Sequence, residues 1–311
     1  MFVIIVGGLS LLPYLISDGA NREMPEQSPV GGEITEIGGF QIHYREWQPE
    51  DSPLGHVFLA HGMAGSIYTW RKTGPALAEA GYHVVAMDLP PFGYSAPVAP
   101  ADAGTSQAAL ARELLEQVAP QAEAWTLIGH SMGAAVIASM AAEWDRTPVG
   151  LVFAGGSHDT AQARRDENPI GRAVFAYPPT QRWIAVVAGR RLLNEEGIAR
   201  ALESAWGSEP DAETVQAYLE PLQLRGTPGA FVEHMLTVKG VSVEAFAGPP
   251  ALILWGENDE WVPVSSGRQL AEALPDSRME LIEGAGHSPM ETHPEPFNAL
   301  LLEFLAARRE Q

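Results

Sequence analysis

Residues 129–133 read Gly-His-Ser-Met-Gly, and this short stretch constrains the fold more than any other part of the chain. It follows an apolar run at residues 125–128 and precedes a run of small residues at 134–142, the pattern of a strand, a sharp turn and a helix. A turn this tight holds Ser131 at strained dihedral angles, and glycine on either side removes side chains that would collide. The Ser131 hydroxyl is therefore expected at the carboxyl end of a strand, with the Met132 amide at a helix start aimed at whatever bonds to that oxygen.

A glycine-flanked serine also arises by chance in a chain with 31 glycines, so the motif needs support from the rest of the sequence. A serine hydroxyl is a poor nucleophile at neutral pH. It needs a base to take its proton, and the base needs a partner that fixes its tautomer and stabilises its charged form. The chemical interpretation therefore depends on whether the chain supplies a base, an acid and a second amide in a suitable order.

The composition is that of a globular protein and excludes several kinds of function. With 46% hydrophobic and 19% charged residues, the 311-residue chain fits one large α/β domain or a domain that carries an insertion. The net charge of −20 repels nucleic acid and anionic lipid headgroups at long range, so no nucleic-acid partner is expected. The absence of cysteine excludes disulfides, thiolate metal sites and a cysteine nucleophile. No phosphate-binding glycine loop or metal-spaced histidine cluster is present, so no metal or organic cofactor is expected.

The chain begins with an apolar segment, residues 1–17, followed by a polar, Gly- and Pro-containing stretch at 18–32 that is typical of a linker. As a helix, the apolar segment would span about 22 Å, short of the about 30 Å hydrocarbon core. No basic residue precedes it and no clear cleavage site follows. It could be a membrane anchor or signal remnant, a short interfacial or partner-binding helix, or a segment packed on the body. We favour the membrane-related interpretation, and hence a membrane-associated or exported protein over a cytoplasmic one.

The next part of the chain, residues 33–156, alternates between strand and helix patterns. Glu33–Ile37 and residues 41–47 form an expected hairpin around Gly38 and Gly39, with His43 on an edge strand. Apolar runs predict buried strands at residues 56–60, 82–87, 125–128 and 149–154. Helical spacing runs between these strands, through residues 66–80 and 105–118. Regular alternation of this kind predicts a mostly parallel sheet with right-handed crossovers.

The alternation stops at residues 157–247, which are helical in pattern and rich in aromatic residues and Pro-Gly breaks. An insertion at this point would lie over the carboxyl ends of the strands, so we interpret it as a helical lid. We expect most of its aromatic side chains in the lid core and a minority toward substrate. Strand and helix patterns resume in residues 248–311, which with residues 33–156 would form the core domain.

A base and an acid are found in the second half of the core domain. His287 follows the last predicted strand, residues 279–282, in a Gly-Ala-Gly-His loop that can place it beside Ser131. Asp259 follows the strand predicted at residues 251–256. All three residues come directly after strands, where open α/β sheets build their sites. The chain order Ser, Asp, His is the order expected for a nucleophile on a strand-to-helix turn.

With these residues in place, the sequence resembles the α/β-hydrolase superfamily, in the lidded branch that includes esterases, haloperoxidase-like enzymes without cofactor, and meta-cleavage-product C–C hydrolases. The resemblance runs from about residue 33 to the C-terminus, and the region interpreted as a lid takes no part in it. Two departures are Pro91, where the family often has glycine, and a serine rather than an aspartate nucleophile, which argues against dehalogenase and epoxide-hydrolase chemistry. The matching stretches are residues 61–63, 88–95, 129–133, 256–263 and 286–297.

The resemblance implies an α/β-hydrolase fold, with a mostly parallel sheet, helices on both faces and a helical lid after the strand that follows the nucleophile helix. It implies that Ser131 is the nucleophile, His287 the base and Asp259 the acid that orients the base. The backbone amides of Met63 and Met132 would form the oxyanion hole, which stabilises charge that develops in the transition state.

Several neighbouring residues offer other assignments. Asp159 is an alternative acid and His293 an alternative base. Glu257 and Glu260 flank the favoured acid and are expected to be solvated loop residues. Asp88 is expected to hold its own loop, and His61 and His130 to support the site rather than to react.

These residues predict a serine hydrolase that cleaves carboxylic esters or related acyl compounds through an acyl-enzyme. The same triad would serve a C–C bond hydrolase or a perhydrolase, and the triad residues cannot separate these activities. A non-catalytic binding protein on the hydrolase fold is a further alternative, although no triad member is missing. The expected partner is a small ester or acyl substrate, with possible membrane association through the N-terminal segment. The sequence does not predict the oligomeric state.

Overall fold

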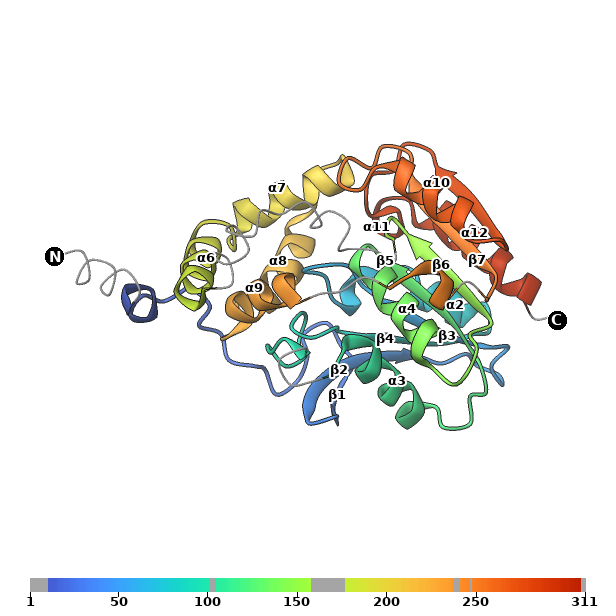
Figure 1. Cartoon of the computed structure of the whole chain (residues 1–311), viewed down its shortest axis with the longest axis horizontal. Helices are drawn as coiled ribbons and strands as arrows, with labels where there is room; N and C mark the ends of the chain where they lie inside the picture. Colours follow the sequence, from blue (N-terminus) through green and yellow to red (C-terminus); the bar gives the residue numbers. More distant parts are fainter. Residues whose placement is uncertain (1–10, 101–104, 158–176, 238–240, 247, 309–311) are drawn as a thin grey trace.

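The computed structural model of the chain describes residues 11–100, 105–157, 177–237, 241–246 and 248–308. Its centre is an eight-stranded sheet in the order β1-β2-β4-β3-β5-β6-β7-β8 (Figure 1). All neighbouring pairs from β4 to β8 are parallel, while β2 runs antiparallel to both β1 and β4. The strands are β1 (Glu33–Ile37), β2 (Phe40–Trp47), β3 (His56–Ala60), β4 (His83–Met87), β5 (Trp125–His130), β6 (Gly150–Ala154), β7 (Ala251–Gly256) and β8 (Ser277–Ile282).

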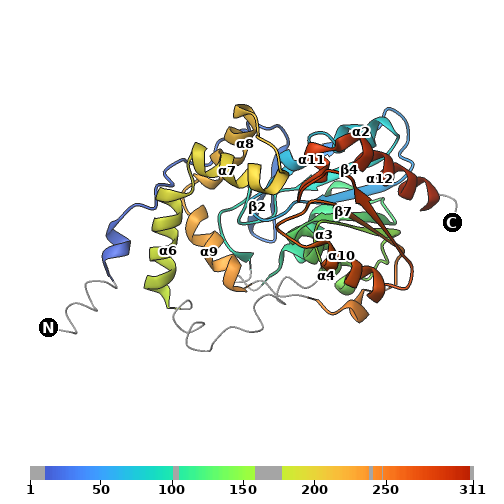
Figure 2. The same ribbon diagram turned by 90° about the horizontal axis from the view of Figure 1, so that it is seen from above.

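Helices cover both faces of this sheet (Figures 1 and 2). Alternate residues of each central strand point to opposite faces, so Phe58 of β3 packs into one hydrophobic cluster and Val57 into the other. One cluster is shared with α3, α4 and α10, and the other with α2 and α12. These helices are α2 (Gly74–Glu79), α3 (Gln107–Val118), α4 (Met132–Glu143), α10 (Val264–Ala273) and α12 (Pro294–Arg308). The predicted α/β architecture with covered faces is confirmed.

The predicted hairpin is formed by β1 and β2, but the position expected for His43 is wrong. Strand β2 lies between β1 and β4 rather than at the sheet edge. His43 is fully buried, and its Nδ1 atom lies 2.6 Å from a carboxylate oxygen of Asp88, the first residue after β4. The alternating pattern identified the strand, but it could not show that the strand would have a neighbouring strand on each side.

Short helical elements connect or follow the strands at the carboxyl edge of the sheet. A 3-10 helix, η1 (Ile67–Trp70), follows β3 and begins at Ser66, whose side chain accepts a hydrogen bond from the amide of Tyr68. The predicted single helix over residues 66–80 is therefore two elements, η1 and α2. The short helix α11 (Pro289–Thr292) stands just after the loop that carries His287.

Four helices in the described residues between β6 and β7 lie together to one side of the sheet (Figures 1 and 2), and we call them the inserted helices. Two of them begin at residues with strong capping side chains, because Asn194 and Asp211 accept hydrogen bonds from backbone amides in the first turn. Gly207, at φ 72°, ends α7 in the left-handed conformation that glycine adopts easily. The inserted helices are α6 (Pro178–Arg191), α7 (Glu195–Trp206), α8 (Ala212–Leu222) and α9 (Thr227–Thr237), and the 3-10 helix η4 (Val243–Ala245) follows them.

Residues 11–17 of the N-terminal segment lie against α6, at one end of the long axis of the molecule (Figure 1). Residues 11–15 are helical, and residues 1–10 of the predicted apolar segment lie outside the described residues. Arg182 of α6 donates to the carbonyl oxygens of Pro13 and Ile16 and forms an ion pair with Asp18. The stretch at 18–32, predicted as a linker, thus begins with a residue that is bonded to the inserted helices.

Among the residues described, no helix has both the length and the apolar character needed to cross a membrane.

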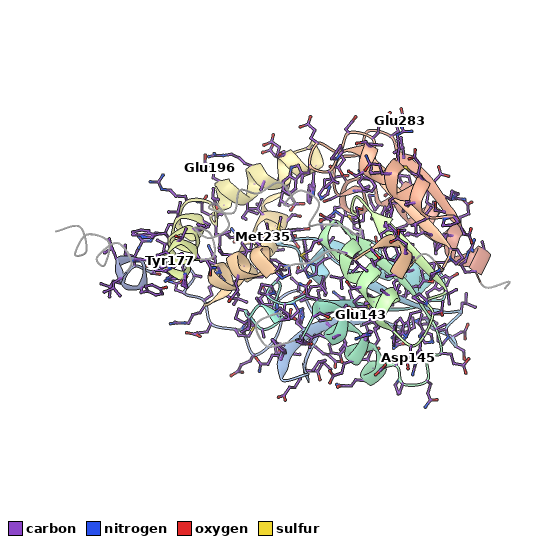
Figure 3. All side chains as sticks on the ribbon, in the orientation of Figure 1. Glu143, Asp145, Tyr177, Glu196, Met235 and Glu283 are labelled. Atoms are coloured by element: carbon purple, nitrogen blue, oxygen red, sulfur yellow. The ribbon has the colours of Figure 1, made fainter. Side chains whose placement is uncertain are left out.

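Asp88, Asp259 and Glu291 are buried, but other acidic residues that contribute to the net charge of −20 lie on the surface. Figure 3 shows the side chains of Glu143, Asp145, Glu196 and Glu283 projecting from different parts of the surface, and all four are exposed. Carboxylates dispersed in this way remain solvated and favour solubility.

Candidate active site

Ser131 lies at the apex of a strained turn between β5 and α4. Its backbone adopts φ 51° and ψ −115°, one of two positive φ values among the described non-glycine residues. Three glycines make this turn possible. A β-carbon at Gly129 would lie 2.4 Å from the carbonyl oxygen of Gly133, one at Gly133 would lie 2.3 Å from that of Ala60, and one at Gly156 would lie 2.2 Å from that of Ser131. Side chains at these glycine positions would therefore collide with the backbone, as predicted for the two glycines that flank Ser131 in the motif.

The structure brings together the three side chains that the sequence selects. The Nε2 atom of His287 lies 3.0 Å from the hydroxyl oxygen of Ser131, and its Nδ1 atom lies 2.8 Å from Oδ2 of Asp259. A carboxylate only accepts hydrogen bonds, so the proton of a neutral His287 is on Nδ1 and Nε2 is free to accept from the serine. The His287 and Asp259 side chains are both buried, which strengthens their interaction.

Asp259 is held in its orientation by backbone amides of its own loop. Its Oδ1 atom accepts hydrogen bonds of 2.9 Å from the amides of both Trp261 and Val262. Oδ2 is therefore directed at His287.

Trp261 and α7 hold the opposite side of the imidazole. The indole of Trp261 stacks on the His287 ring, with centroids 5.5 Å apart and planes inclined by 26°. The indole N–H donates to the hydroxyl of Ser204 in α7, at 3.1 Å. The carbonyl oxygen of Ala205, also in α7, accepts a 2.6 Å hydrogen bond from the backbone amide of His287. The inserted helices thus help to fix the position of the base.

The loop after β3 passes beside the serine. A β-carbon at Gly62 would lie 3.0 Å from Cβ of Ser131. The next residue, Met63, lines a cavity that opens onto Ser131. Ala64 has φ 59°, so the loop carries strain next to the hydroxyl. Met132 is the first residue of α4, and the amide groups of a helix start have no partner within the helix. Both residues predicted to supply oxyanion amides therefore adjoin Ser131.

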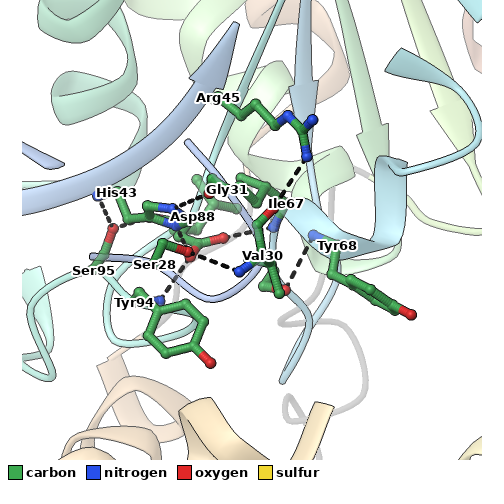
Figure 4. Close-up of polar contacts among 12 residues, drawn as sticks. Ser28, Val30, Gly31, His43, Arg45, Ile67, Tyr68, Asp88, Tyr94 and Ser95 are labelled. Carbon is green, nitrogen blue, oxygen red and sulfur yellow. Dashed lines mark hydrogen bonds and ion pairs between the residues drawn. The ribbon is translucent and has the colours of Figure 1, made fainter. Parts of the chain in front are cut away.

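A buried polar network anchors this loop to the sheet (Figure 4). Asp88 accepts hydrogen bonds from the backbone amides of Ile67 at 2.6 Å and Tyr94 at 2.7 Å, and it contacts Nδ1 of His43. Nε2 of His43 lies 2.8 Å from the carbonyl oxygen of Gly31. Both partners of the imidazole are acceptors, so both nitrogens donate and the ring is cationic. Burial opposes the charge, but the Asp88 carboxylate prevails and raises the pKa of His43.

His61 and His130 support the site through the backbone. Nε2 of His61 accepts from the amide of Leu89 at 2.8 Å, and its Nδ1 donates to the carbonyl of Gly62 at 2.7 Å. Nε2 of His130 donates to the carbonyl of His287 at 3.0 Å. Burial, together with the nearby imidazole of His287, lowers the pKa of His130 to about 3.

The depressed pKa of His130 predicts loss of stability in acid. Below pH 6.5 the unfolded chain binds a proton that the folded chain does not take up until its pKa of about 3, so folding is disfavoured as the pH falls between these values. Through this linkage, His130 should make the free energy of unfolding about 2 kcal/mol lower at pH 5 than at pH 7. Urea unfolding at pH 7 and pH 5 should therefore show that His130→Asn loses about 2 kcal/mol less than the wild type on acidification.

The control for this measurement is His293→Asn, because His293 is a partly exposed histidine at the start of α12. It should lose as much stability as the wild type between the two pH values. An equal loss in His130→Asn and in the wild type would contradict the assignment of the acid sensitivity to His130.

The other residues considered from the sequence lie elsewhere. Nδ1 of His293 is bonded to the Thr292 hydroxyl, not to the serine. Glu257 and Glu260 are exposed, and Glu257 accepts a 3.3 Å hydrogen bond from the amide of Gly284. Asp159 lies outside the described residues. Within the described part of the chain, no group of three or more histidine or acidic side chains could hold a metal ion.

A cavity of about 120 Å³ opens onto Ser131 and His287. One wall is the loop after β3, and much of the remainder comes from the inserted helices α7 and α8. Of the described residues that line it, none is Lys, Arg, Asp or Glu. The lining from the inserted helices is Ile198, Ala201, Leu202, Ala205, Trp206, Tyr218 and Leu222.

Sequence reasoning missed three features of this site. Two of them contact His287: the stacked indole of Trp261 and the carbonyl oxygen of Ala205 in α7. The third is the ion pair between Arg71 and Glu291, in which Nη1 and Oε2 are 2.5 Å apart. Trp261 lies two residues from Asp259, so its closeness to the site could have been noticed. The other two features join segments that are distant in sequence and follow no local pattern.

Comparison with known proteins agrees with this geometry. The model of the alpha/beta hydrolase fold family matches residues 55–294. A 2-hydroxy-6-oxononadienedioate/2-hydroxy-6-oxononatrienedioate hydrolase from Pseudomonas is 25% identical over 260 residues, covering 80% of this chain and 87% of that protein.

Two solved structures share the fold at low sequence identity. A membrane phospholipase A, described as a bacterial virulence factor, superposes with a TM-score of 0.67 at 21% identity, over 100% of this chain and 96% of the other. A putative aryl esterase from Burkholderia cenocepacia superposes with a TM-score of 0.69 at 23% identity, over 90% of this chain and 100% of the other. With the family model covering residues 55–294, the chain belongs to the alpha/beta hydrolase fold family and is a hydrolase.

Proposed function

We propose that the protein is a serine hydrolase that cleaves small, neutral carboxylic esters through an acyl-enzyme. Ser131 is the nucleophile, His287 the general base and Asp259 the acid that orients it. The observation that carries the proposal is the continuous chain of contacts from hydroxyl to imidazole to carboxylate, at 3.0 and 2.8 Å.

Each step of the reaction follows from these contacts. The Ser131 oxygen attacks the ester carbonyl carbon while its proton moves to Nε2 of His287. The carbonyl oxygen becomes an oxyanion, which the amides of Met63 and Met132 stabilise. The C–O bond to the alcohol then breaks, and the alcohol leaves with the proton from His287. Water, deprotonated by the same imidazole, attacks the acyl-enzyme and releases the carboxylic acid and free Ser131.

The cavity favours a neutral ester over the dioic acids named for the Pseudomonas relative. A substrate carboxylate needs a cationic partner when it is buried, and the described lining residues include none. A cavity of about 120 Å³ also favours a short acyl chain, because pockets that hold drug-sized ligands measure about 300–1,000 Å³. C–C bond hydrolysis and perhydrolysis remain the alternative activities of the same triad.

We also propose that the inserted helices act as a lid. Their contribution to the cavity wall and the bond from Ala205 to His287 support this role, because movement of α7 would change both substrate access and the position of the base.

The proposal predicts a strong preference for uncharged acyl groups. Ethyl butyrate should be hydrolysed with a kcat/KM about 100-fold higher than monoethyl succinate, which places a carboxylate at the end of a similar acyl chain. A fluorophosphonate probe should label Ser131, as identified by peptide mass spectrometry.

The alternative activities are assayed on the same protein, with a vinylogous diketone for C–C cleavage and with peroxide plus acetate for perhydrolysis. Faster turnover of the succinate monoester, or of the diketone, than of the butyrate ester would contradict the proposed substrate class. An unlabelled Ser131 would contradict the nucleophile.

A further inference from the structure

One polar pair interrupts the apolar wall of the cavity. Thr69 in η1 and Tyr218 in α8 both line the cavity, and their hydroxyl oxygen atoms are 3.0 Å apart. The two residues come from different parts of the fold, since η1 follows β3 and α8 is one of the inserted helices. Thr69 also adjoins the loop beside the serine, because a β-carbon on Gly65 would lie 3.2 Å from the threonine oxygen. The pair thus stands in the wall of the same cavity as Ser131.

Glu291 sets the direction of hydrogen bonding at this pair. Its carboxylate is fully buried in α11, and Oε2 accepts a 2.5 Å hydrogen bond from the Arg71 guanidinium. Its Oε1 atom is bonded to the Tyr218 hydroxyl. Burial raises the pKa of Glu291, and the adjacent Arg71 opposes that effect. The guanidinium is always charged and favours the ionised carboxylate, which has no hydrogen to donate. The single hydrogen of Tyr218 must therefore point to Glu291.

The direction of the Thr69 hydrogen follows from that of Tyr218. Because Tyr218 uses its only hydrogen on the carboxylate, its oxygen can only accept from Thr69. Thr69 therefore spends its own hydrogen on Tyr218. The oxygen of Thr69 keeps free lone pairs, so this pair offers the cavity hydrogen-bond acceptors but no donor.

From this directed chain we infer that the pocket selects esters bearing a hydroxyl group, which donates to Thr69 and completes the sequence substrate–Thr69–Tyr218–Glu291. The inference rests on the proposed ester hydrolysis and narrows its substrate class to hydroxylated esters. A site arranged to bond a substrate hydroxyl discriminates against an analogue that lacks it, because its polar atoms then remain unpaired. A neutral hydrogen bond of this kind corresponds to a preference of about tenfold in kcat/KM.

The hydroxyl could belong to the alcohol part or to the acyl part of the ester, and two matched pairs distinguish these sources. The alcohol pair is 2-hydroxyethyl butyrate and 2-fluoroethyl butyrate, and the acyl pair is methyl 3-hydroxybutyrate and methyl 3-fluorobutyrate. Fluorine is close to a hydroxyl in size but cannot donate a hydrogen bond. In the wild type, kcat/KM should be about tenfold higher for the hydroxyl compound in at least one pair.

Three substitutions test the direction of the chain. Thr69→Val removes the acceptor and should bring the hydroxyl-to-fluorine ratio close to one, whereas Thr69→Ser should restore it. Tyr218→Phe frees the hydrogen of Thr69 to point into the cavity as a donor while its oxygen can still accept, so it should weaken the preference. Thr73→Val is the matched control and should keep the wild-type ratio. Thr73 is buried close by in sequence, and its hydroxyl has no hydrogen-bond partner in the described structure.

The outcomes separate this inference from the proposed function. A ratio near one for both pairs in the wild type, or a preference that persists in both Thr69→Val and Tyr218→Phe, would overturn the inference while ester hydrolysis stands. Should the wild type cleave none of the four esters and leave Ser131 unlabelled by the phosphonate, ester hydrolysis itself would fail and the inference with it.

Discussion

Replacing Ser131 with alanine should lower kcat for p-nitrophenyl butyrate by about 10⁴-fold or more. Alanine has no oxygen to form the acyl-enzyme, so turnover through the His287 contact at 3.0 Å is lost. The fold should be retained, because alanine meets the same backbone strain at φ 51° as serine and is no larger. Steady-state kinetics give the first quantity, and far-UV circular dichroism with urea unfolding gives the second.

The control is Ser139→Ala, in the helix that follows the nucleophile. The Ser139 hydroxyl donates to the carbonyl of Ala135 within α4 and does not line the cavity. This variant should keep kcat within about threefold of the wild type, since a single bond inside a helix contributes little. A Ser131→Ala enzyme that retains more than a hundredth of wild-type turnover would show that another group attacks the ester.

Replacing Asp259 with asparagine should lower kcat by about 10⁴-fold through the tautomer of the base. The amides of Trp261 and Val262 both donate to Oδ1, so the single oxygen of asparagine will take that position. Its NH₂ group then faces Nδ1 of His287, which must accept and so gives up its hydrogen. The remaining proton moves to Nε2, directed at Ser131, where it prevents the imidazole from taking the serine proton.

Three other acidic residues considered from the sequence serve as comparisons for this variant. Glu257→Gln and Glu260→Gln should have turnover close to that of the wild type, because both side chains are exposed loop residues. Asp159→Asn tests the alternative acid that follows β6. If Asp259→Asn stays within tenfold of the wild type while Asp159→Asn loses activity, the assignment of the acid is wrong.

The core of the fold could be predicted because its signals are local. Apolar runs of four to six residues predicted the buried strands, and the glycines beside Ser131 indicated a close approach of the backbone within a few residues. Asp259 and His287 could be selected because each directly follows a strand, and parallel strands bring their carboxyl ends to one edge. The boundaries were less certain, and one predicted helix after β3 proved to be η1 and α2.

The environment of His43 shows where local patterns fail. The alternation of β2 was recognised, but the pattern of one strand does not say which strands pair with its two sides. Only the sheet order places β4 beside β2 and thus brings Asp88 to His43. A histidine interpreted as an edge residue became the cationic centre of a buried network.

The sequence by itself determined the hydrolase core, the strained serine turn and the order of nucleophile, acid and base. Only the tertiary structure decided what surrounds them: the stacked Trp261, the α7 carbonyl on His287, and the directed chain from Thr69 through Tyr218 to Glu291. The physical reason is sequence distance. Thr69 and Tyr218 are 149 positions apart, so their contact depends on how the inserted helices pack on the sheet. Arg71 and Glu291 are 220 apart, so their contact depends on how α11 packs beside η1. No periodicity or motif within either partner encodes that packing.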